Sequence, residues 1–288
     1  MKQVSMLFDF DGVLFDSSWE VTTVILLVYY SSFPDSNISK YFKNTVSLKL
    51  LSSLKNYSAE HVFKTLRNEN TKINNIFRKL RTYCIDVDDF FVVSQLADNH
   101  FFDLKNLTFR FVNHNFYYSY KKQIIENKKE ELEKFIKTFY DVRKYIKENN
   151  ENFWIILNEP FEKELNTFLE FYKKYNVGIL STKQKYAILA ILHYYNIPID
   201  SSKVFAKENE FIHKGKKIKE IINYWNIKEE DLHFVDDLIE NLLKVKDYNK
   251  NVNLYITSWG YSNYYHRNLA RKNGIRIINN LSQIENYI

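Results

Sequence analysis

Glycine is scarce in this 288-residue chain, and its distribution constrains the fold more than any other feature. Only five glycines occur, and none lies between residues 13 and 177. Tight turns and positions with a positive φ favour glycine, so a long interval without it favours helices. Apolar residues recur at helical spacing through the same interval, at 19–30, 59–82, 90–97, 104–116 and 121–148. The middle of the chain is therefore predicted to be helical.

The hydrophobic period changes on both sides of this interval. Short apolar runs bounded by turn signals alternate there with segments of helical spacing. The predicted strands are 4–8, 177–180, 232–235, 254–257 and 275–278, and the predicted helices are 161–175, 184–195, 216–225, 239–245 and 264–272. Such alternation is typical of a parallel sheet covered by helices on both faces. We predict an α/β fold in which residues 1–16 and 153–288 form a Rossmann-like core, and residues 17–152 form an inserted all-helical domain.

Composition excludes several classes of protein. Hydrophobic residues make up 45% of the chain and charged residues 26%, which argues against a disordered or fibrous chain. The longest apolar stretch near the N-terminus, 21–30, is half as long as a membrane span requires. The single cysteine, Cys84, cannot form an internal disulfide, which is typical of a reducing compartment. We therefore expect a cytoplasmic protein without a membrane partner.

The formal net charge of +6 raises the question of a polyanionic partner. The excess lysines lie mostly in amphipathic stretches such as 121–137, where they alternate with glutamates as on a solvated helix face. This pattern argues against a nucleic-acid partner. The sequence carries no signal for the oligomeric state.

Two pairs of aspartates follow predicted strands. Asp9 and Asp11 come directly after the first strand, and Gly12 allows the chain to turn away. Asp236 and Asp237 come directly after the strand at 232–235. The carboxyl ends of parallel strands lie at one edge of a sheet, so we expect the four carboxylates to converge there. Their mutual repulsion implies a bound cation or shared protons, and oxygen ligands favour Mg²⁺ over zinc.

Two further segments predict a phosphate site. Ser181 and Thr182 follow the second predicted strand and offer hydroxyls and backbone amides close to a helix N-terminus, which is a favourable place for an anion. Lys214 opens a later helix, where a lysine is able to reach a phosphate as a point charge. Lys216 and Lys217 lie within one turn of it, so the choice among the three lysines stays open.

The order of these motifs resembles the haloacid dehalogenase superfamily, in particular its phosphoglycolate-phosphatase-like branch. The resemblance covers the whole core, residues 1–18 and about 153–288. It rests on Asp9-Phe10-Asp11-Gly12-Val13-Leu14, Ile179-Leu180-Ser181-Thr182-Lys183, Lys214 and Phe234-Val235-Asp236-Asp237, with Thr257-Ser258-Trp259-Gly260-Tyr261 similar to a tail segment of that branch. The chain departs from the commonest fourth motif, Gly-Asp with a later Asp, because Asn241 follows its acidic pair. This departure leaves the composition of the metal shell open.

The resemblance implies a phosphatase that acts on a small phosphate monoester. Asp9 is implied as the nucleophile that forms an aspartyl-phosphate, and Asp11 as the acid and base that moves protons. Ser181 is implied to hold a phosphoryl oxygen with Thr182 beside it, and Lys214 to bridge Asp9 and the phosphate. An aspartate at position 11 points to phosphatase or phosphomutase chemistry, because dehalogenating members of the family lack it.

The resemblance also implies Mg²⁺ as the one cofactor. Its implied ligands are the Asp9 carboxylate, the backbone carbonyl of Asp11 and the Asp237 carboxylate, with Asp236 in support. Magnesium and lysine together offset the charge on the transferring phosphoryl group, which is the main requirement of this chemistry.

The inserted domain resembles the helical C1-type cap of this branch, although about 135 residues is long for such a cap. Ser17 to Glu20 fits a capping box, so a helix is predicted to begin there. Arg110 and Arg143 are the candidate substrate contacts, since arginine suits an anionic group. His114 lies in an aromatic run and is interpreted as a core residue rather than a ligand.

Two alternatives to a phosphatase stay open at this point. A phosphomutase would use the same nucleophile and hold a sugar phosphate for a second transfer. A protein that keeps the fold without turnover would act by binding, although such proteins usually lose one residue of the set found here. The sequence does not indicate which phosphate ester is the substrate.

Overall fold

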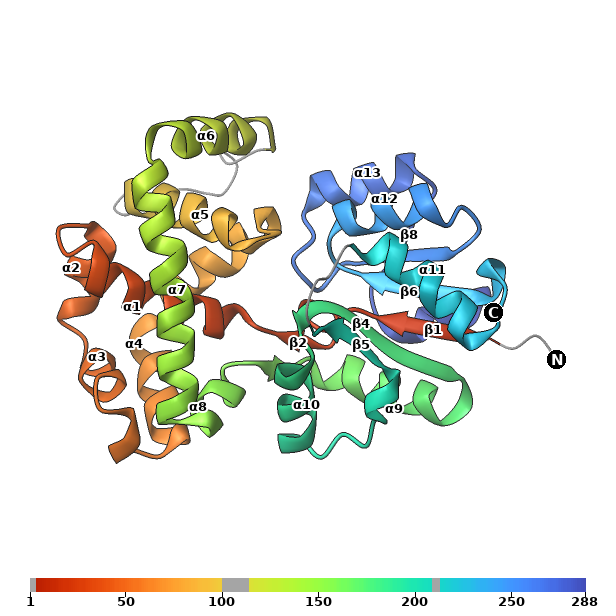
Figure 1. The fold of residues 1–288 in the computed structure, drawn as a ribbon, viewed down its shortest axis with the longest axis horizontal. Helices are drawn as coiled ribbons and strands as arrows, with labels where there is room; N and C mark the ends of the chain where they lie inside the picture. Colours follow the sequence, from red (N-terminus) through yellow and green to blue (C-terminus); the bar gives the residue numbers. More distant parts are fainter. Residues whose placement is uncertain (1–3, 100–113, 209–212) are drawn as a thin grey trace. The chain divides into compact units, whose positions relative to one another are not determined.

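The computed structural model describes residues 4–99, 114–208 and 213–288 (Figure 1). They divide into two compact units, one made of residues up to 16 together with 159–288, the other of residues 17–158. The chain returns to the first unit at 159 rather than at the predicted 153. The reason is a last short helix, α8 (Glu151–Ile156), which packs on α4 (Ala59–Leu80) and α7 (Lys129–Asn149) of the second unit.

A six-stranded parallel sheet forms the centre of the first unit, in the order β5-β4-β1-β6-β7-β8. At its middle Leu7 pairs with Gly178 on one side and with Phe234 on the other. The strands are β1 (Ser5–Phe8), β4 (Asn176–Gln184), β5 (Val204–Lys207), β6 (Leu232–Asp236), β7 (Asn253–Thr257) and β8 (Arg276–Ile278). The predicted α/β fold with a parallel sheet is confirmed, and every predicted strand occurs. The edge strand β5 was not predicted.

Helices cover both faces of this sheet (Figure 1). Leu7 faces a core that includes Ile218 and Leu242, whereas its neighbour Phe8 packs on Phe168 from the opposite face. This alternation along a strand is what buries a parallel sheet on both sides. The helices are α9 (Glu162–Lys174), α10 (Lys185–Tyr194), α11 (Lys214–Trp225), α12 (Ile239–Tyr248) and α13 (Tyr264–Lys272), with 3₁₀ turns η4 (Ser201–Lys203), η5 (Glu229–Asp231) and η6 (Leu281–Tyr287).

A small antiparallel ribbon joins the two ends of the insertion. It pairs β2 (Phe15–Asp16) with β3 (Glu159–Pro160), so the chain leaves the first unit after one strand of the ribbon and re-enters it at the other. Both crossing points are therefore fixed by backbone hydrogen bonds within the first unit.

The second unit is helical wherever the structure describes it. α1 (Ser18–Ser32) is buried over residues 18–29 and packs against α7, α2 (Asn37–Lys43) and α4. The other helices are α3 (Val46–Leu51), α5 (Val87–Asn99) and α6 (His114–Asn127), with 3₁₀ turns η1 (Leu54–Asn56) and η2 (Arg81–Tyr83). The predicted helix at 104–116 lies almost wholly outside the described residues. Among the described helices, none combines the length and the apolar character needed to cross a bilayer.

The capping box predicted at the start of α1 is wrong. α1 begins at Ser18, but the Ser17 side chain makes no capping hydrogen bond to it. The Glu20 carboxylate accepts hydrogen bonds from Arg143 of α7 and from Trp154 of α8. The Ser17 half of the predicted motif is therefore absent, and the Glu20 carboxylate has tertiary partners.

Candidate active site

Asp9 stands at the carboxyl end of the central strand β1. Its backbone N–H donates to the Val235 carbonyl at 2.9 Å, which continues the parallel ladder with β6 by one residue. The Asp9 carboxylate accepts the Phe10 N–H at 2.7 Å through Oδ1. The sheet thus fixes both the position and the orientation of this carboxylate.

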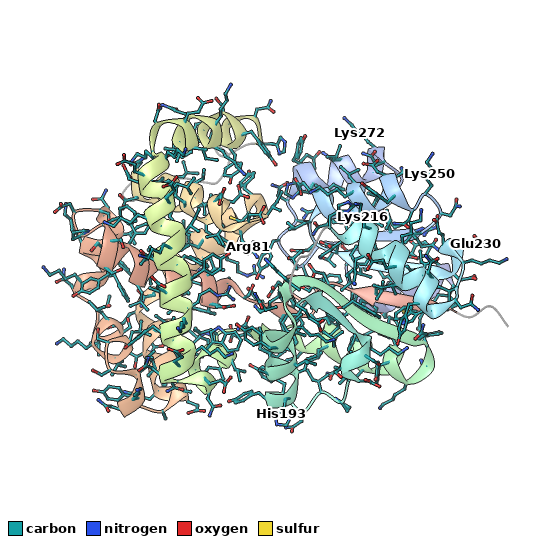
Figure 2. All side chains as sticks on the ribbon, in the orientation of Figure 1. Arg81, His193, Lys216, Glu230, Lys250 and Lys272 are labelled. Atoms are coloured by element: carbon teal, nitrogen blue, oxygen red, sulfur yellow. The ribbon has the colours of Figure 1, made fainter. Side chains whose placement is uncertain are left out.

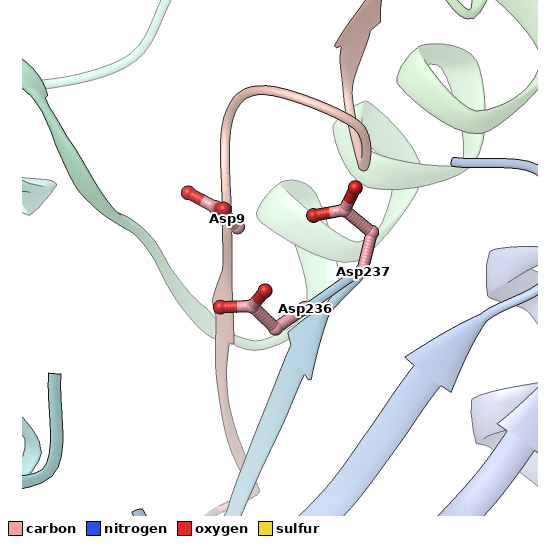
Figure 3. A group of neighbouring side chains, drawn as sticks. All are labelled: Asp9, Asp236 and Asp237. Carbon is pink, nitrogen blue, oxygen red and sulfur yellow. The ribbon is translucent and has the colours of Figure 1, made fainter. Parts of the chain in front are cut away.

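Three buried carboxylates meet at this edge of the sheet. β6 ends at Asp236, and Asp237 follows it, so the strand pairing brings both beside Asp9 (Figure 3). One oxygen from each of the three carboxylates lies within 4.8 Å of the others. The convergence expected from the sequence is therefore present for Asp9, Asp236 and Asp237.

Lys214 is the cation inside this cluster. Its Nζ lies 2.8 Å from Asp9 Oδ2 and 2.7 Å from Asp236 Oδ2, and its side chain is 1% exposed. Burial lowers the pKa of Lys214, but the charges of Asp236 and Asp9 outweigh burial and raise it overall, so the ammonium stays charged. Lys217 instead pairs with Glu220, and Lys216 is exposed (Figure 2). Of the three lysines left open by the sequence, Lys214 is the one that contacts Asp9.

Burial and charges of both signs act on Asp9. Burial raises the pKa of Asp9 to about 6, and the charges of Asp236 and Asp11 add to the rise while Lys214 opposes it. Lys214 contacts two of the three buried carboxylates, and every candidate donor atom of the group is a carboxylate oxygen. A divalent cation with a preference for oxygen ligands fits this donor set.

Asp236 and Asp237 have different surroundings. Both oxygens of Asp236 take part in hydrogen bonds: the Leu238 N–H donates to Oδ1 at 2.8 Å, and Asn241 Nδ2 lies 3.1 Å from Oδ2 and 3.3 Å from Oδ1. The Asp237 carboxylate accepts the Tyr261 N–H at 2.9 Å through Oδ2. Asp236 is therefore held by Lys214 and by its own loop, as a supporting residue would be.

Two glycines leave the space that Asp237 occupies. Gly12 has a φ of +78°, and a Cβ there would lie 2.1 Å from Asp237 Oδ2. A Cβ at Gly260 would lie 2.2 Å from the Gly12 carbonyl oxygen. The turn at Gly12 was predicted, but the packing of Gly260 against it was not, because the two glycines are far apart in the sequence.

Lys183 is a residue of this site that the sequence analysis missed. Its Nζ lies 3.3 Å from Asp11 Oδ1, and its side chain is 7% exposed. Its backbone N–H donates to Ser181 Oγ at 3.3 Å, and Ser181 is itself buried while Thr182 is exposed. β4 continues through Gln184, so these residues extend a strand rather than open a helix. Alternation along the strand explains why Thr182 faces away from its two neighbours.

Solved structures provide a comparison for this architecture. A candidate phosphatase from Clostridium difficile is 13% identical with a TM-score of 0.59, and the match covers 100% of this chain and 99% of that one. A candidate haloacid dehalogenase-like hydrolase from Bacteroides fragilis is 16% identical over 98% and 100% of the two chains, with a TM-score of 0.56. The chain has the haloacid dehalogenase fold. The family resemblance drawn from the sequence is therefore confirmed at the level of the fold.

A candidate phosphoglycolate phosphatase from Lactobacillus delbrueckii subsp. bulgaricus shares the same fold. It is 11% identical, its TM-score is 0.58, and the match covers 100% of this chain and 99% of that one. No protein-family model matches the sequence, and no curated protein matches it. Only the fold is retained at these identities, so the function has to be argued from the side chains.

Three residues of the helical insertion were considered as substrate contacts from the sequence, namely Arg110, His114 and Arg143. Arg110 lies outside the described residues. His114 begins α6, is partly buried and packs on Tyr118 with ring centroids 4.3 Å apart. Arg143 lies on α7, and its Nη2 and Nε donate to Glu20 Oε1 at 2.6 and 3.0 Å. At least part of the Arg143 guanidinium therefore serves the interior of the helical unit.

Replacing Arg143 is expected to destabilise that unit. The Glu20 side chain is 4% exposed, and Arg143→Ala removes two charge-assisted hydrogen bonds to its carboxylate. We expect the free energy of unfolding to fall by about 2 kcal/mol, measured by urea denaturation. Lys144→Ala is the matched control, because Lys144 lies 3.8 Å from Glu148 with both side chains mostly exposed, and it should change stability by less than about 0.5 kcal/mol. Equal effects of the two substitutions would contradict a structural role for Arg143.

Proposed function

We propose that this protein is a magnesium-dependent phosphatase that hydrolyses a small phosphate monoester through an aspartyl-phosphate on Asp9. The observation that carries the proposal is the buried Lys214 ammonium between Asp9 and Asp236, with the Asp237 carboxylate beside them. Parallel α/β sheets bind ligands at this carboxyl edge. The names of the solved phosphatases with the same fold support the same reaction class.

Each residue has a defined part in the proposed reaction. An Asp9 carboxylate oxygen forms a bond to phosphorus while the bond from phosphorus to the ester oxygen breaks. Asp11 gives a proton to the departing oxygen, and later takes a proton from the water that attacks the aspartyl-phosphate. That second step releases inorganic phosphate and restores the Asp9 carboxylate.

The surrounding cations and hydroxyls hold the phosphoryl group in this proposal. Lys214 already contacts Asp9, so its ammonium is within reach of a phosphoryl group bonded to that carboxylate. Ser181 offers a buried hydroxyl at the end of the neighbouring strand β4. Lys183 Nζ lies 3.3 Å from Asp11 Oδ1, so its ammonium is close to the group that moves protons in this proposal.

Mg²⁺ is the proposed cofactor. Asp9, Asp237 and the backbone carbonyl of Asp11 would hold it, with Asp236 in support. When bound, it would offset the negative charge on the transferring phosphoryl oxygens. The donor set fits, because it consists of oxygen atoms, which Mg²⁺ prefers as ligands.

Removal of the metal tests this proposal directly. Hydrolysis of p-nitrophenyl phosphate should fall to the level of a protein-free blank in excess chelator, because the three buried carboxylates then repel the substrate phosphate. Excess Mg²⁺ should restore it. Ca²⁺ should restore much less, since it favours more ligands at longer distances than Mg²⁺ does. Undiminished turnover in excess chelator would contradict the proposal.

The substrate itself is proposed as a class, a small phosphorylated metabolite. Thr182, Arg110 and Arg143 stay proposed substrate contacts. A panel of phosphate esters assayed with Mg²⁺ would identify the preferred member of the class.

A further inference from the structure

A cavity of about 630 Å³ lies in the first unit, lined by residues of α13 and of the edge strand β8. Three arginines line it, Arg267 and Arg271 from α13 and Arg276 from the start of β8. Ser258, Asn279 and Tyr287 also line it. We call these six residues the arginine pocket. Its volume is in the range of sites for small molecules, about 300–1,000 Å³.

The arginines of this pocket are not neutralised by carboxylates of the described chain. No aspartate or glutamate lines the cavity. The carboxylates of neighbouring elements pair elsewhere, Glu285 with Lys174 at 3.5 Å and Glu240 with His266 at 4.0 Å. Burial, with the charge of Arg271 in addition, lowers the pKa of Arg267. Three like charges thus face one cavity, which is unfavourable unless an anion joins them.

The guanidinium groups are held in place through one nitrogen each. Every described hydrogen bond of the three arginines comes from Nη1, so Nη2 and Nε of each have no described protein acceptor. The bonds run from Arg267 to the Ser262 carbonyl at 2.8 Å and its Oγ at 3.2 Å, from Arg271 to Asn268 Oδ1 at 2.8 Å, and from Arg276 to Asn253 Oδ1 at 2.9 Å and the Tyr255 hydroxyl at 3.4 Å.

Two aromatic rings orient the guanidinium of Arg276. Arg276 Cζ lies 4.6 Å from the ring centroid of Tyr287 and 5.6 Å from that of Tyr255. Such stacking fixes the guanidinium plane, and an oriented guanidinium fork matches the oxygens of a phosphate. Tyr287 is also 46% exposed, so one part of its ring is open to a ligand.

We propose that the arginine pocket binds a small molecule that carries two or more phosphate groups. Three guanidinium groups without described carboxylate partners, two of them partly buried, favour a polyvalent anion, and arginine binds phosphate oxygens in pairs. The cavity size favours a small molecule over a nucleic acid. Inorganic pyrophosphate and a nucleoside diphosphate share this chemistry, and the exposed Tyr287 ring distinguishes them because it can stack on a base.

Calorimetric titration of the full chain tests the proposal. The probes are pyrophosphate and, separately, ADP, both in excess chelator so that no metal assists the catalytic edge of the sheet. Arg271→Gln and Arg276→Gln should each weaken pyrophosphate binding by about tenfold or more, because each removes charge-assisted hydrogen bonds. Arg271 is exposed and its described bond is to Asn268 on its own helix, so its variant stays folded.

Lys272→Gln is the matched control, since Lys272 is the next residue on α13, is exposed and does not line the cavity (Figure 2). It should change binding less than twofold. Absence of pyrophosphate binding by the native protein would overturn the proposal, as would native affinity in both arginine variants. Equal weakening by Lys272→Gln would also overturn it, because it would show general attraction to a basic surface. If ADP binds more tightly than pyrophosphate and Tyr287→Ala removes the difference, the pocket is a nucleotide site. If the two affinities are equal, the pocket recognises the phosphates alone.

Discussion

Asp9→Asn should abolish phosphate ester hydrolysis while the protein stays folded. An amide nitrogen or oxygen is a poor nucleophile toward phosphorus, so we expect turnover of p-nitrophenyl phosphate to fall by at least about 10³-fold. The phosphorylated form of the enzyme, detected as a mass increase after acid quenching, should disappear as well. At pH 7 the pKa of about 6 means that Asp9 is mostly ionised in a site that disfavours the charge. Its replacement by a neutral group of the same shape therefore costs little stability.

Asp11→Asn is the comparison that separates the two aspartates by role. A residue that moves protons affects both half-reactions, but the nucleophile remains, so the variant should be slowed and should still form the phosphorylated enzyme. Turnover close to native in Asp9→Asn would overturn the assignment of the nucleophile. Loss of phosphorylation in Asp11→Asn alone would exchange the two roles.

The carboxylate cluster was predictable because it depends on a general property of parallel sheets. Strands β1 and β6 were recognisable as buried apolar runs, and the residues that follow adjacent parallel strands must meet at one edge. The convergence of Asp9, Asp236 and Asp237 could therefore be predicted without information on side-chain packing. It also predicted that Lys214 starts a helix near that edge.

Features that depend on tertiary partners were not predictable from local patterns. β5 is a short edge strand in which Val204 is buried and Phe205 is half-buried, so it lacks the apolar run of a central strand. Lys183 reaches Asp11 only because β4 extends past its apolar part. Glu20 fits a local capping box, yet its carboxylate also accepts hydrogen bonds from two residues more than 120 positions away, which no local pattern indicates.

Replacing Lys214 should affect stability and turnover together. Lys214→Gln removes the ammonium between Asp9 and Asp236 and leaves two buried carboxylates close to each other. Loss of one partner of a buried ion pair typically costs about 3–5 kcal/mol, so we expect the free energy of unfolding in chelator to fall by about that amount. Turnover with Mg²⁺ should fall by about 10²–10³-fold, because a positive charge next to the transferring phosphate is lost. Urea denaturation and p-nitrophenyl phosphate hydrolysis measure the two effects.

Lys217→Gln is the matched control for this prediction, because Lys217 is one turn further along the same helix and its Nζ pairs with Glu220 at 2.8 Å on the surface. An exposed pair of this kind contributes little, so stability should change by less than about 0.5 kcal/mol and turnover not at all.

Lys214→Arg should not rescue turnover, since the planar guanidinium is too broad for a place where one ammonium lies 2.7 and 2.8 Å from two carboxylates. If Lys214→Gln instead behaved like Lys217→Gln in both measurements, Lys214 would not be the cation that the phosphate needs, and the proposed chemistry at Asp9 would lose its main support.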